Sequence, residues 1–592
     1  MSTQFLHKIR STLFSPESRL ELFVRTLYHR AAASKAFFWV QEKMVQTSYR
    51  RWKTWQKKQI PPVTRTSSRQ PLVSFLIDHS QENLTQLQQT LDSILAQNTE
   101  NWEILIITPE NRINAGAEPD PRIKTVDHPA NLLDEISGEY LVFCKSGDVF
   151  STSLLGKFNE VLAEGEEPDL IYYDCEIKQG NLGSRKPLFK PAVYAPELMI
   201  SVNYLSRAVI KVDAVRSTTR DIASHVDLPS QEYSILTNLY ENNGKYRHLP
   251  YQLLFQKDWS LPLNHEPSMD VLKDRFQHLG VHDLTIIKHE HSAQLQWPTP
   301  RVPVSIIILT KNHHRMLKAL LTSIRSQDYD QEYEIILVDN ASDDEKVLNY
   351  YRELEKETDL HIINYAKPFN YSEAINLGVH HSNHELILLL NDDMQVASPG
   401  WLSELSRWAM LPEIGVVGAK LIRKNHVIQH MGIVMGLVGF VGHIYLNAPE
   451  HYHGLWGSSD WYRNVIAITG ACQMMRREVF DRVGGYNPDY RIAFGDIDFC
   501  RRIFELGFRN MVTPFARLYH YEGQTRGYLT PVDDTLKGYQ EFTPYLLEDD
   551  PYYSPNLTYT RIPKCVREAR SYSERSAQIE TRKQFYLNNP DI

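Results

Sequence analysis

The stretch LILLLNDDMQVASPG, residues 386–400, carries three adjacent side chains that could hold a cation. Five apolar residues lead directly into Asn391, Asp392 and Asp393. A continuous apolar run is typical of a buried strand in a parallel sheet, and ligands of open α/β sheets bind beyond the carboxyl ends of such strands. Carboxylates at that edge favour Mg²⁺ or Mn²⁺, which are often held by one or two carboxylates and substrate phosphates. The alternative is that the two acids only cap a turn or a helix.

The strand that would position these acids belongs to a pattern that occurs twice. PLVSFLI (residues 71–77) returns as PVSIIIL (303–309), and SILAQNTENWEILII (93–107) returns as SIRSQDYDQEYEIILV (323–338). Each copy predicts a strand, a helix and a second strand, the right-handed crossover that builds a parallel sheet. The sequence therefore predicts two similar α/β domains. A segment with three prolines, SAQLQWPTPRVPV (292–304), would link them.

Composition limits the classes of partner. A chain of 592 residues is too long for one hydrophobic core, so two or three domains are expected. The net charge of −8 argues against nucleic-acid binding. Five scattered cysteines without CxxC spacing favour neither a disulfide framework nor a zinc site, which fits a reducing cytoplasm. The closest approach to a membrane span, GIVMGLVGFVG (432–442), is short and contains four glycines.

The first 60 residues are basic, most densely in YRRWKTWQKKQ (49–59), and no signal peptide is expected. We expect a helical extension here. One interpretation is a solvated helix face. The other is an interfacial helix on anionic lipid, because Trp52 and Trp55 are interleaved with basic residues. Peripheral contact with the inner face of the cytoplasmic membrane is therefore left open.

Seven motifs of the second copy resemble, in their order, family 2 glycosyltransferases with a GT-A fold. They are VSIIILTKN, ILVDNASDD, FNYSEAINLGV, LLLNDDMQV, TGACQMMRREVFDRVGGYNPDY, FGDIDFCRR and RLYHYEG. The tandem arrangement is similar to bacterial proteins of O-antigen and other envelope polysaccharide synthesis, described as rhamnosyltransferase-like. The resemblance implies an α/β fold with two tandem GT-A domains, each a Rossmann-like, mostly parallel sheet.

The resulting domain prediction has five parts. They are a helical basic extension (1–65), a degenerate GT-A domain (70–285), a linker (286–302), a catalytic GT-A domain (303–528) and a C-terminal tail or appendage (529–592). The tail is polar and rich in Tyr and Pro, and its fold is left open.

The resemblance implies a metal site. It places Asp393 in the DxD metal motif of the family, here NDD, with Asn391 as a further ligand and Asp392 beside the nucleotide sugar. It also places a metal-binding histidine at His520, where neutral imidazole is a suitable ligand. The expected cofactor is Mg²⁺ or Mn²⁺, which neutralises charge that develops on the leaving diphosphate. The alternative for His520 is a packed core residue.

The resemblance also implies a donor site. Thr310, Asp339 and Asn340 would surround the nucleobase and ribose of a dTDP-, UDP- or GDP-sugar. Asn376 belongs to an NLG motif that would let the backbone approach the donor, and Arg526 could pair with the diphosphate through its planar guanidinium. Turn formation is the alternative role of Asp339, and the glycine of NLG could equally serve a helix or turn.

An acceptor hydroxyl becomes a good nucleophile when a base takes its proton. In FGDIDFCRR, Asp496 falls where family members keep this base, and attack opposite the leaving group would invert the anomeric centre. The alternative for Asp496 and Asp498 is the helix N-cap, where Asp is favoured.

The first copy lacks the metal motif. Where the second copy has LLLNDDMQ, the first has LVFCKSGDVF (141–150), so KSG replaces the DxD triplet and Asp148 is the acid that remains. Two further positions change in step, opposite Asp496 and His520: Glu232 and Gln256. A lysine cannot hold a cation. We therefore predict a pseudo-glycosyltransferase that binds acceptor glycan, positions the second domain or mediates assembly.

The leading hypothesis is an inverting, metal-dependent glycosyltransferase that uses its second domain. It would move a sugar from a nucleotide diphosphate to a glycan or lipid-linked glycan of the bacterial surface. One alternative is a bifunctional transferase whose first domain works without metal through Glu232 or Asp148. The other is a non-catalytic glycan-binding or scaffold protein, against which the joint retention of Asp393, Asp496 and His520 argues.

Overall fold

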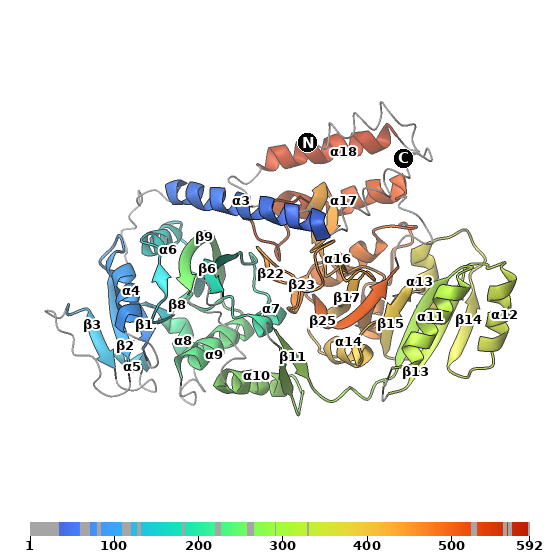
Figure 1. Ribbon diagram of the computed structural model, residues 1–592, viewed down its shortest axis with the longest axis horizontal. Helices are drawn as coiled ribbons and strands as arrows, with labels where there is room; N and C mark the ends of the chain where they lie inside the picture. Colours follow the sequence, from blue (N-terminus) through green and yellow to red (C-terminus); the bar gives the residue numbers. More distant parts are fainter. Residues whose placement is uncertain are drawn as a thin grey trace.

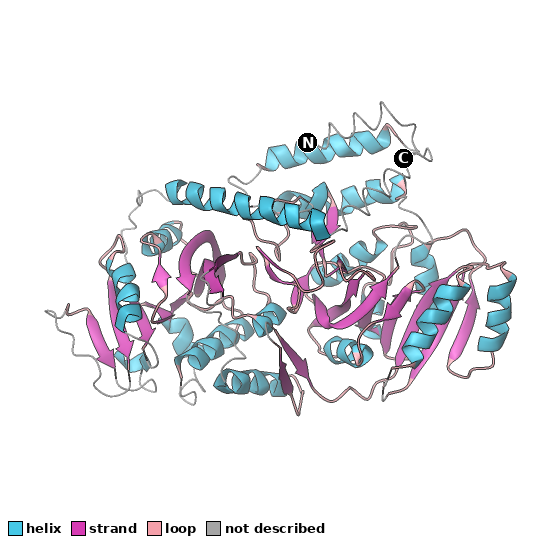
Figure 2. Cartoon of the chain, in the orientation of Figure 1, coloured by secondary structure: helices cyan, strands magenta, loops and turns pink. Residues whose placement is uncertain are grey.

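The chain forms two α/β halves that lie along the long axis of the molecule (Figure 1). The structure is a computed structural model that describes residues 35–59, 72–79, 84–108, 120–126, 132–179, 184–218, 227–256, 266–289, 292–327, 329, 331–521, 530–560, 565 and 571–589. Each half contains its own large sheet with helices around it (Figure 2). The predicted fold class is confirmed.

The sheet of the first half has the strand order β3-β2-β1-β4-β8-β6-β9-β5, with β7 paired to β6. In the described ranges its strands are β1 (Val73–Asp78), β2 (Trp102–Ile107), β3 (Ile123–Val126), β4 (Tyr140–Lys145), β5 (Val149–Phe150), β6 (Leu170–Gln179), β7 (Ser184–Leu188), β8 (Val209–Lys211) and β9 (Tyr246–Gln256). Strands β1 to β4 are mutually parallel, so their carboxyl ends share one edge.

The sheet of the second half has the order β14-β13-β12-β15-β24-β17-β25-β16, with β18 paired to β17 and β23 to β25. Its described strands are β12 (Val304–Thr310), β13 (Tyr333–Asp339), β14 (Leu360–Asn364), β15 (Leu386–Asn391), β16 (Met394–Val396), β17 (Ile414–Ile422), β18 (Ile428–His430), β23 (Arg463–Val465), β24 (Cys472–Arg476) and β25 (Arg509–His520). Parallel and antiparallel neighbours follow in the same order as in the first sheet. The repeat in the sequence is thus a repeat in topology.

One buried hydrogen bond occurs in both halves. The hydroxyl of Ser74 donates to Glu103 over 2.6 Å, and the hydroxyl of Ser305 donates to Glu334 over the same distance. Each serine lies near the start of the central strand and each glutamate on its parallel neighbour. The shared serine that aligns the two sequence copies therefore has the same structural role in both.

Helices cover the second sheet because their apolar residues recur on one face. In α11 (His314–Arg325), Leu317, Leu320, Leu321 and Ile324 are each 3% exposed or less, at the spacing of an amphipathic helix. The other helices of this half are α12 (Glu345–Leu354), α13 (Tyr371–His380), α14 (Trp401–Ala409), α15 (Arg477–Arg482) and α16 (Gly495–Glu505). Those of the first half are α4 (Leu84–Leu95), α5 (Leu132–Glu135), α6 (Leu154–Ala163), α7 (Pro196–Ser201), α8 (Val212–Thr218), α9 (Leu228–Glu241) and α10 (Glu266–His278).

The segment predicted as a linker is packed against the second half. Strands β10 (Thr285–Lys288) and β11 (Ala293–Gln296) form an antiparallel pair. Just after β11, the ring of Trp297 lies 5.4 Å from that of Trp408 in α14. This connection is therefore ordered by burial of its aromatic side chain.

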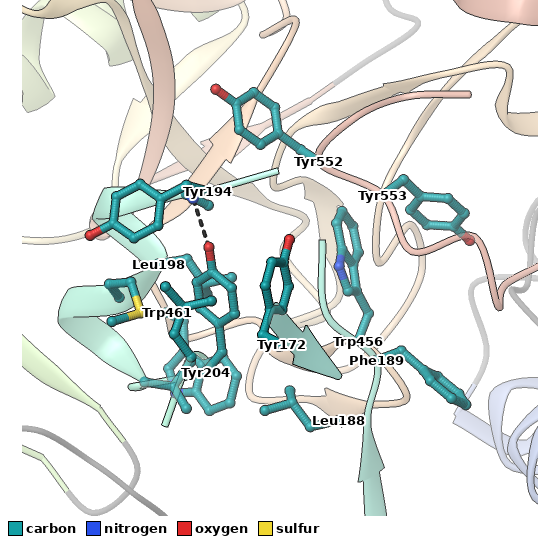
Figure 3. Packing of buried hydrophobic residues seen from close by; sticks show 14 of the residues in the cluster. Tyr172, Leu188, Phe189, Tyr194, Leu198, Tyr204, Trp456, Trp461, Tyr552 and Tyr553 are labelled. Carbon is teal, nitrogen blue, oxygen red and sulfur yellow. Dashed lines mark hydrogen bonds between the residues drawn. The ribbon is translucent and has the colours of Figure 1, made fainter. Parts of the chain in front are cut away.

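The two halves meet through buried contacts. Figure 3 shows the cluster in which side chains of both halves and of the tail pack together: Tyr172, Leu188, Phe189, Tyr194, Leu198 and Tyr204, with Trp456, Trp461, Tyr552 and Tyr553. Beside this cluster, the guanidinium of Arg509 at the start of β25 lies 3.0 Å from the carboxylate of Glu197 in α7. Glu197 is 3% exposed. A buried ion pair of this kind requires both halves to keep their relative position.

The basic N-terminal region contributes a long helix, α3 (Lys35–Gln59), that crosses both halves (Figure 1). Tyr49 donates to Glu176 of β6 over 2.9 Å, and Tyr452 of the second half donates to Glu42 over 2.6 Å. The tail contributes α17 (Val532–Glu548) and α18 (Tyr572–Leu587), which pack on each other. None of the described helices is both long and apolar enough to cross a membrane.

Candidate functional site

A cavity of about 610 Å³ opens at the carboxyl ends of the parallel strands in the second half. Seven of the ten residues predicted for the site line it: Thr310, Asn340, Asn391, Asp392, Asp393, Asp496 and His520. Arg526 lies outside the described residues. Asp339 and Asn376 lie close by but outside the described lining of this cavity.

Strand register explains why these residues converge. Thr310 ends β12 beside Asp339, which ends β13, and Leu309 pairs with Asn391 at the end of β15. The apolar residues of β15 are 2% exposed or less, so this strand is fixed by the core up to the point where the polar triplet begins. Because the NDD triplet directly follows the apolar run, its acids lie at the edge of the sheet.

Asp393 and His520 are the predicted metal ligands that the fold brings into contact. His520 ends β25, where it pairs with Met394 of β16, directly after Asp393. Its Nε2 lies 3.3 Å from Oδ1 of Asp393, and both side chains are buried. Its Nδ1 lies 3.1 Å from the amide oxygen of Gln429. In neutral His520, Nδ1 then carries the hydrogen and Nε2 presents its lone pair.

A lone pair and a carboxylate oxygen this close together fit a cation held by both. In the described part of the chain, no group of three or more His, Cys, Asp or Glu side chains is arranged to hold a metal ion. Mg²⁺, however, is usually bound by one or two carboxylates, with water and substrate phosphates as its other ligands. Asp393 and His520 therefore suit a cation that shares its coordination with a diphosphate.

Asp392 has a partner that the sequence analysis missed. Its Oδ2 lies 3.0 Å from Nδ1 of His313, the residue before α11. The hydrogen bond to Asp392 raises the pKa of His313 above its ordinary value. The two adjacent acids of the triplet thus face different groups, Asp392 an imidazole at the helix start and Asp393 the end of β25. The position of His313 directly after LTKN is a signal that could have indicated it.

Asp496 and Asp498 open α16 but have different surroundings. Phe494 adopts a left-handed backbone (φ 65°) that turns the chain into the helix. Asp496 is half-buried, lines the cavity and accepts a hydrogen bond from the backbone N–H of Gly470 over 2.7 Å. Asp498 is 1% exposed, and its two oxygens accept from Arg501 and Arg502, each over 2.8 Å.

The residues predicted around the nucleoside have hydrogen bonds within the protein. Asp339 accepts from the hydroxyl of Tyr351 over 2.8 Å and from the backbone N–H of Ser342 over 3.0 Å, which closes the turn after β13. Asn340 lines the cavity and donates to the carbonyl of Tyr365 over 3.0 Å. Their roles toward a nucleotide stay predictions.

Asn376 belongs to α13 and joins it to the loop before α16. Its amide donates to the carbonyl of Tyr486 over 2.8 Å and accepts from the N–H of the same residue over 2.9 Å. Its predicted role beside the donor stays a prediction.

The apolar, glycine-rich run near residue 437 forms a wall of the cavity. Strands β19 (Ile433–Met435) and β20 (Val441–His443) form a hairpin that contributes Ile433, Val441 and His443 to the lining. Behind it, Nδ1 of His443 lies 2.8 Å from Nδ1 of buried His430. Burial, and then His443, lower the pKa of His430 well below its ordinary value.

The C-terminal tail holds this wall in place. Asp550 is 1% exposed and accepts from the backbone N–H of Met435 in β19 over 2.9 Å. Burial raises the pKa of Asp550 to about 7. The tail, predicted only as an appendage, therefore contributes directly to the shape of the cavity.

Near the corresponding edge of the first half, an arginine pairs with the acids. Strand register places Lys145 where β15 has Asn391, and Gln256 at the end of β9 where β25 has His520. Nearby, Nε of Arg207 lies 2.8 Å from Asp148 and its Nη1 lies 3.1 Å from Glu232.

The arginine and both acids are buried. Burial alone would lower the pKa of Arg207. Asp148 and Glu232 outweigh this effect and raise that pKa above its ordinary value. Burial raises the pKa of Glu232. Asp148 and Glu232 are the two acids considered for a metal-free mechanism. Both are therefore paired with Arg207, a cation of the chain itself.

Comparisons with known proteins find a family match in the second half. Residues 305–484 match the profile of Glycosyl transferase family 2. The "Uncharacterized protein y4gI" of Sinorhizobium fredii is 29% identical over 533 residues, which is 83% of this chain and 58% of that protein. The "O-antigen biosynthesis protein RfbC" of Myxococcus xanthus is 28% identical over 527 residues, 83% of this chain and 41% of that protein. The chain thus spans less than two thirds of the length of either relative.

Solved structures of glycosyltransferases align more loosely. GalNAc-T7 with UDP, GalNAc and Mn²⁺ aligns with 14% identity and a TM-score of 0.36, over 52% of this chain and 60% of that one. The mannosyltransferase PcManGT of Pyrobaculum calidifontis, in complex with GDP-Man and Mn²⁺, aligns with 14% identity and a TM-score of 0.33, over 62% and 88%.

Proposed function

We propose, from the match of residues 305–484 to the profile of Glycosyl transferase family 2, that the second half is an inverting, metal-dependent glycosyltransferase. The donor is a sugar on dTDP, UDP or GDP, and the acceptor is a glycan or lipid-linked glycan of the bacterial surface. The observation that carries the proposal is that Asp393, His520 and Asp496 face one cavity, with Asp393 and His520 3.3 Å apart.

Asp393 and His520 would hold Mg²⁺ or Mn²⁺, and Asn391 borders the same cavity. When bound, the cation neutralises negative charge on the departing diphosphate. The amide of Gln429 fixes the ring of His520, so Nε2 faces Asp393. We assign to Arg526 the pairing with diphosphate, as the sequence predicts.

Asp496 acts as the base. Its Oδ2 accepts a hydrogen bond from the backbone N–H of Gly470, which orients the carboxylate, and a carboxylate oxygen can accept more than one hydrogen bond. It takes the proton of the acceptor hydroxyl while the hydroxyl oxygen forms a bond to the anomeric carbon. The bond from that carbon to the diphosphate oxygen breaks on the opposite face, so the configuration inverts.

The first half is assigned a supporting role. Arg207 engages both acids that a second active site would use, and the edge lacks the acidic triplet. These observations favour a pseudo-glycosyltransferase over a bifunctional enzyme. The contacts of Glu197 with Arg509 suggest that it positions the strand that ends in His520.

The test is isothermal titration of UDP, dTDP and GDP with and without Mn²⁺, on the natural protein and on Asp393→Ala. We expect one nucleotide to bind only when metal is present, and the variant to lose this binding. Absence of binding by every nucleotide would favour the scaffold alternative. Binding that needs no metal and survives Asp393→Ala would assign the nucleotide to a different site.

A further inference from the structure

The outward face of α3 has no structural role in the contacts described so far. Three large apolar side chains are exposed near its start: Trp39 (59%), Val40 (53%) and Met44 (45%). Five basic side chains are exposed along it: Lys43, Arg50, Arg51, Lys57 and Lys58. We call these eight residues the outer face of α3. They recur at spacings of three, four and seven residues, which places them on one side of a helix.

The opposite side of α3 is anchored to the protein. Val45, Tyr49 and Trp52 are 5% exposed or less, and the ring of Trp52 lies 5.1 Å from that of Phe189. Trp52 therefore packs inward, which corrects its interpretation as one of two interfacial anchors, while Trp55 is half-buried. The outer face consequently points away from the protein.

Charge on the outer face is of one sign. The acid of α3, Glu42, is half-buried and accepts from Tyr452. Lys53, on the inward side, pairs with Glu176. In the parts of the chain that the structure describes, no carboxylate pairs with Arg50, Arg51, Lys57 or Lys58. The face is thus a strip of cations on a protein whose net charge is −8.

We infer that the outer face of α3 is a docking surface for an anionic phospholipid membrane. A helix that lies in the membrane interface places large apolar side chains below the headgroups and basic side chains at their level. Trp39, Val40 and Met44 supply the first group, and the five cations supply attraction to anionic lipid. The absence of acids on this face matches that partner, because a carboxylate would be repelled by the lipid phosphates.

This surface is independent of the catalytic proposal and can be tested without a sugar donor. The full chain is sedimented with vesicles of phosphatidylcholine alone, or of phosphatidylcholine with phosphatidylglycerol. We expect binding to the mixed vesicles, loss of that binding at high salt, and little binding to neutral vesicles. Each cation removed weakens binding about fivefold, so Arg50→Ser/Arg51→Ser binds on the order of 25-fold more weakly.

Two further variants keep the test decisive. Trp39→Ser/Met44→Ser removes the apolar part of the outer face, and we expect it also to weaken binding. Lys346→Ser/Lys356→Ser removes two exposed lysines on or beside α12, and it should bind as the natural protein does. All these side chains are exposed, so circular dichroism should show unchanged folding.

The inference is overturned if the protein ignores both kinds of vesicle, or if it binds neutral and anionic vesicles equally. It is also overturned if the α3 variants bind as well as the α12 control. A self-associated protein that becomes monomeric in Trp39→Ser/Met44→Ser, without any lipid binding, would assign the face to a second copy of the chain instead.

Discussion

Two carboxylates at the start of α16, Asp496 and Asp498, differ in burial and in hydrogen-bond partners. Asp496 lines the cavity and accepts hydrogen bonds from the backbone N–H groups of Gly470 and Ile497. Asp498 is almost wholly buried and is held by two guanidinium groups. The same residue type two positions apart can therefore act on a ligand in one case and stabilise the fold in the other.

We predict that Asp496→Asn lowers the rate of sugar transfer by about a hundredfold or more, because a positioned base contributes about 10²–10⁴-fold. Nucleotide binding by titration should stay within a few-fold, since the metal pair of Asp393 and His520 is intact. The measurement is a single-turnover transfer assay beside calorimetric titration of the same samples.

Asp498→Asn is the matched control for this prediction. It leaves Arg501 and Arg502 without a buried counter-charge, so the free energy of unfolding should fall by about 3 kcal/mol. Protein that remains folded should retain a transfer rate well above that of Asp496→Asn. Equal loss of rate in both variants, at unchanged nucleotide affinity, would contradict the assignment of the base to Asp496.

At the scale of elements, α17 of the tail holds the loop that leads into α16. Asp534 is fully buried, and its carboxylate accepts from three successive backbone N–H groups, those of Arg491 (3.1 Å), Ile492 (2.8 Å) and Ala493 (2.8 Å). Ile492 and Ala493 also line the cavity. The position of Asp496, three residues further on, therefore depends on a helix from the far end of the sequence.

We predict that Asp534→Ala reduces the transfer rate by about tenfold to a hundredfold, because a displacement of about 1 Å at a reacting group can cost that much. Three N–H groups would lose their acceptor, and each unsatisfied group costs about 1–3 kcal/mol if it stays buried. Thermal unfolding should therefore show a lower midpoint as well.

Asp534→Asn retains one acceptor oxygen and should lie between Asp534→Ala and the natural protein in both measurements. Asp533→Ala, one residue earlier and exposed, should leave rate and midpoint unchanged. If Asp534→Ala transfers sugar at the natural rate, α17 does not position the base.

The contrast between β15 and α17 shows what the sequence could predict. An apolar run followed by NDD is a local pattern, and the physics of a buried parallel strand indicates where its end must lie. The strands, the repeat and the polar residues at strand ends could therefore be predicted from the sequence. The contacts of Asp534, Asp550 and Arg207 join segments far apart in the chain, and no spacing near these residues distinguishes them from ordinary charged positions.

At the scale of the whole molecule, two copies of one topology surround their acids differently. In the second half the acids face an open cavity suited to a metal ion, whereas in the first half Arg207 supplies its own positive charge to Asp148 and Glu232. Because Arg207 is part of the chain, it does not exchange with ions in solution as a bound metal ion does. The first half thus keeps the topology of the second, while its acids are paired with a side chain of the protein itself.

This difference predicts the stoichiometry of donor binding. Titration of the preferred nucleotide with Mn²⁺ should give one site per chain, because the first-half edge lacks the acidic triplet and its remaining acids are paired with Arg207. Asp393→Ala should abolish the whole binding signal, whereas Arg207→Ala should leave the one site in place. Arg207→Ala should also lower the free energy of unfolding by about 3–5 kcal/mol, since two buried carboxylates lose their partner. Two sites per chain, or one site that survives Asp393→Ala and is lost in Arg207→Ala, would instead make the first half a working donor site.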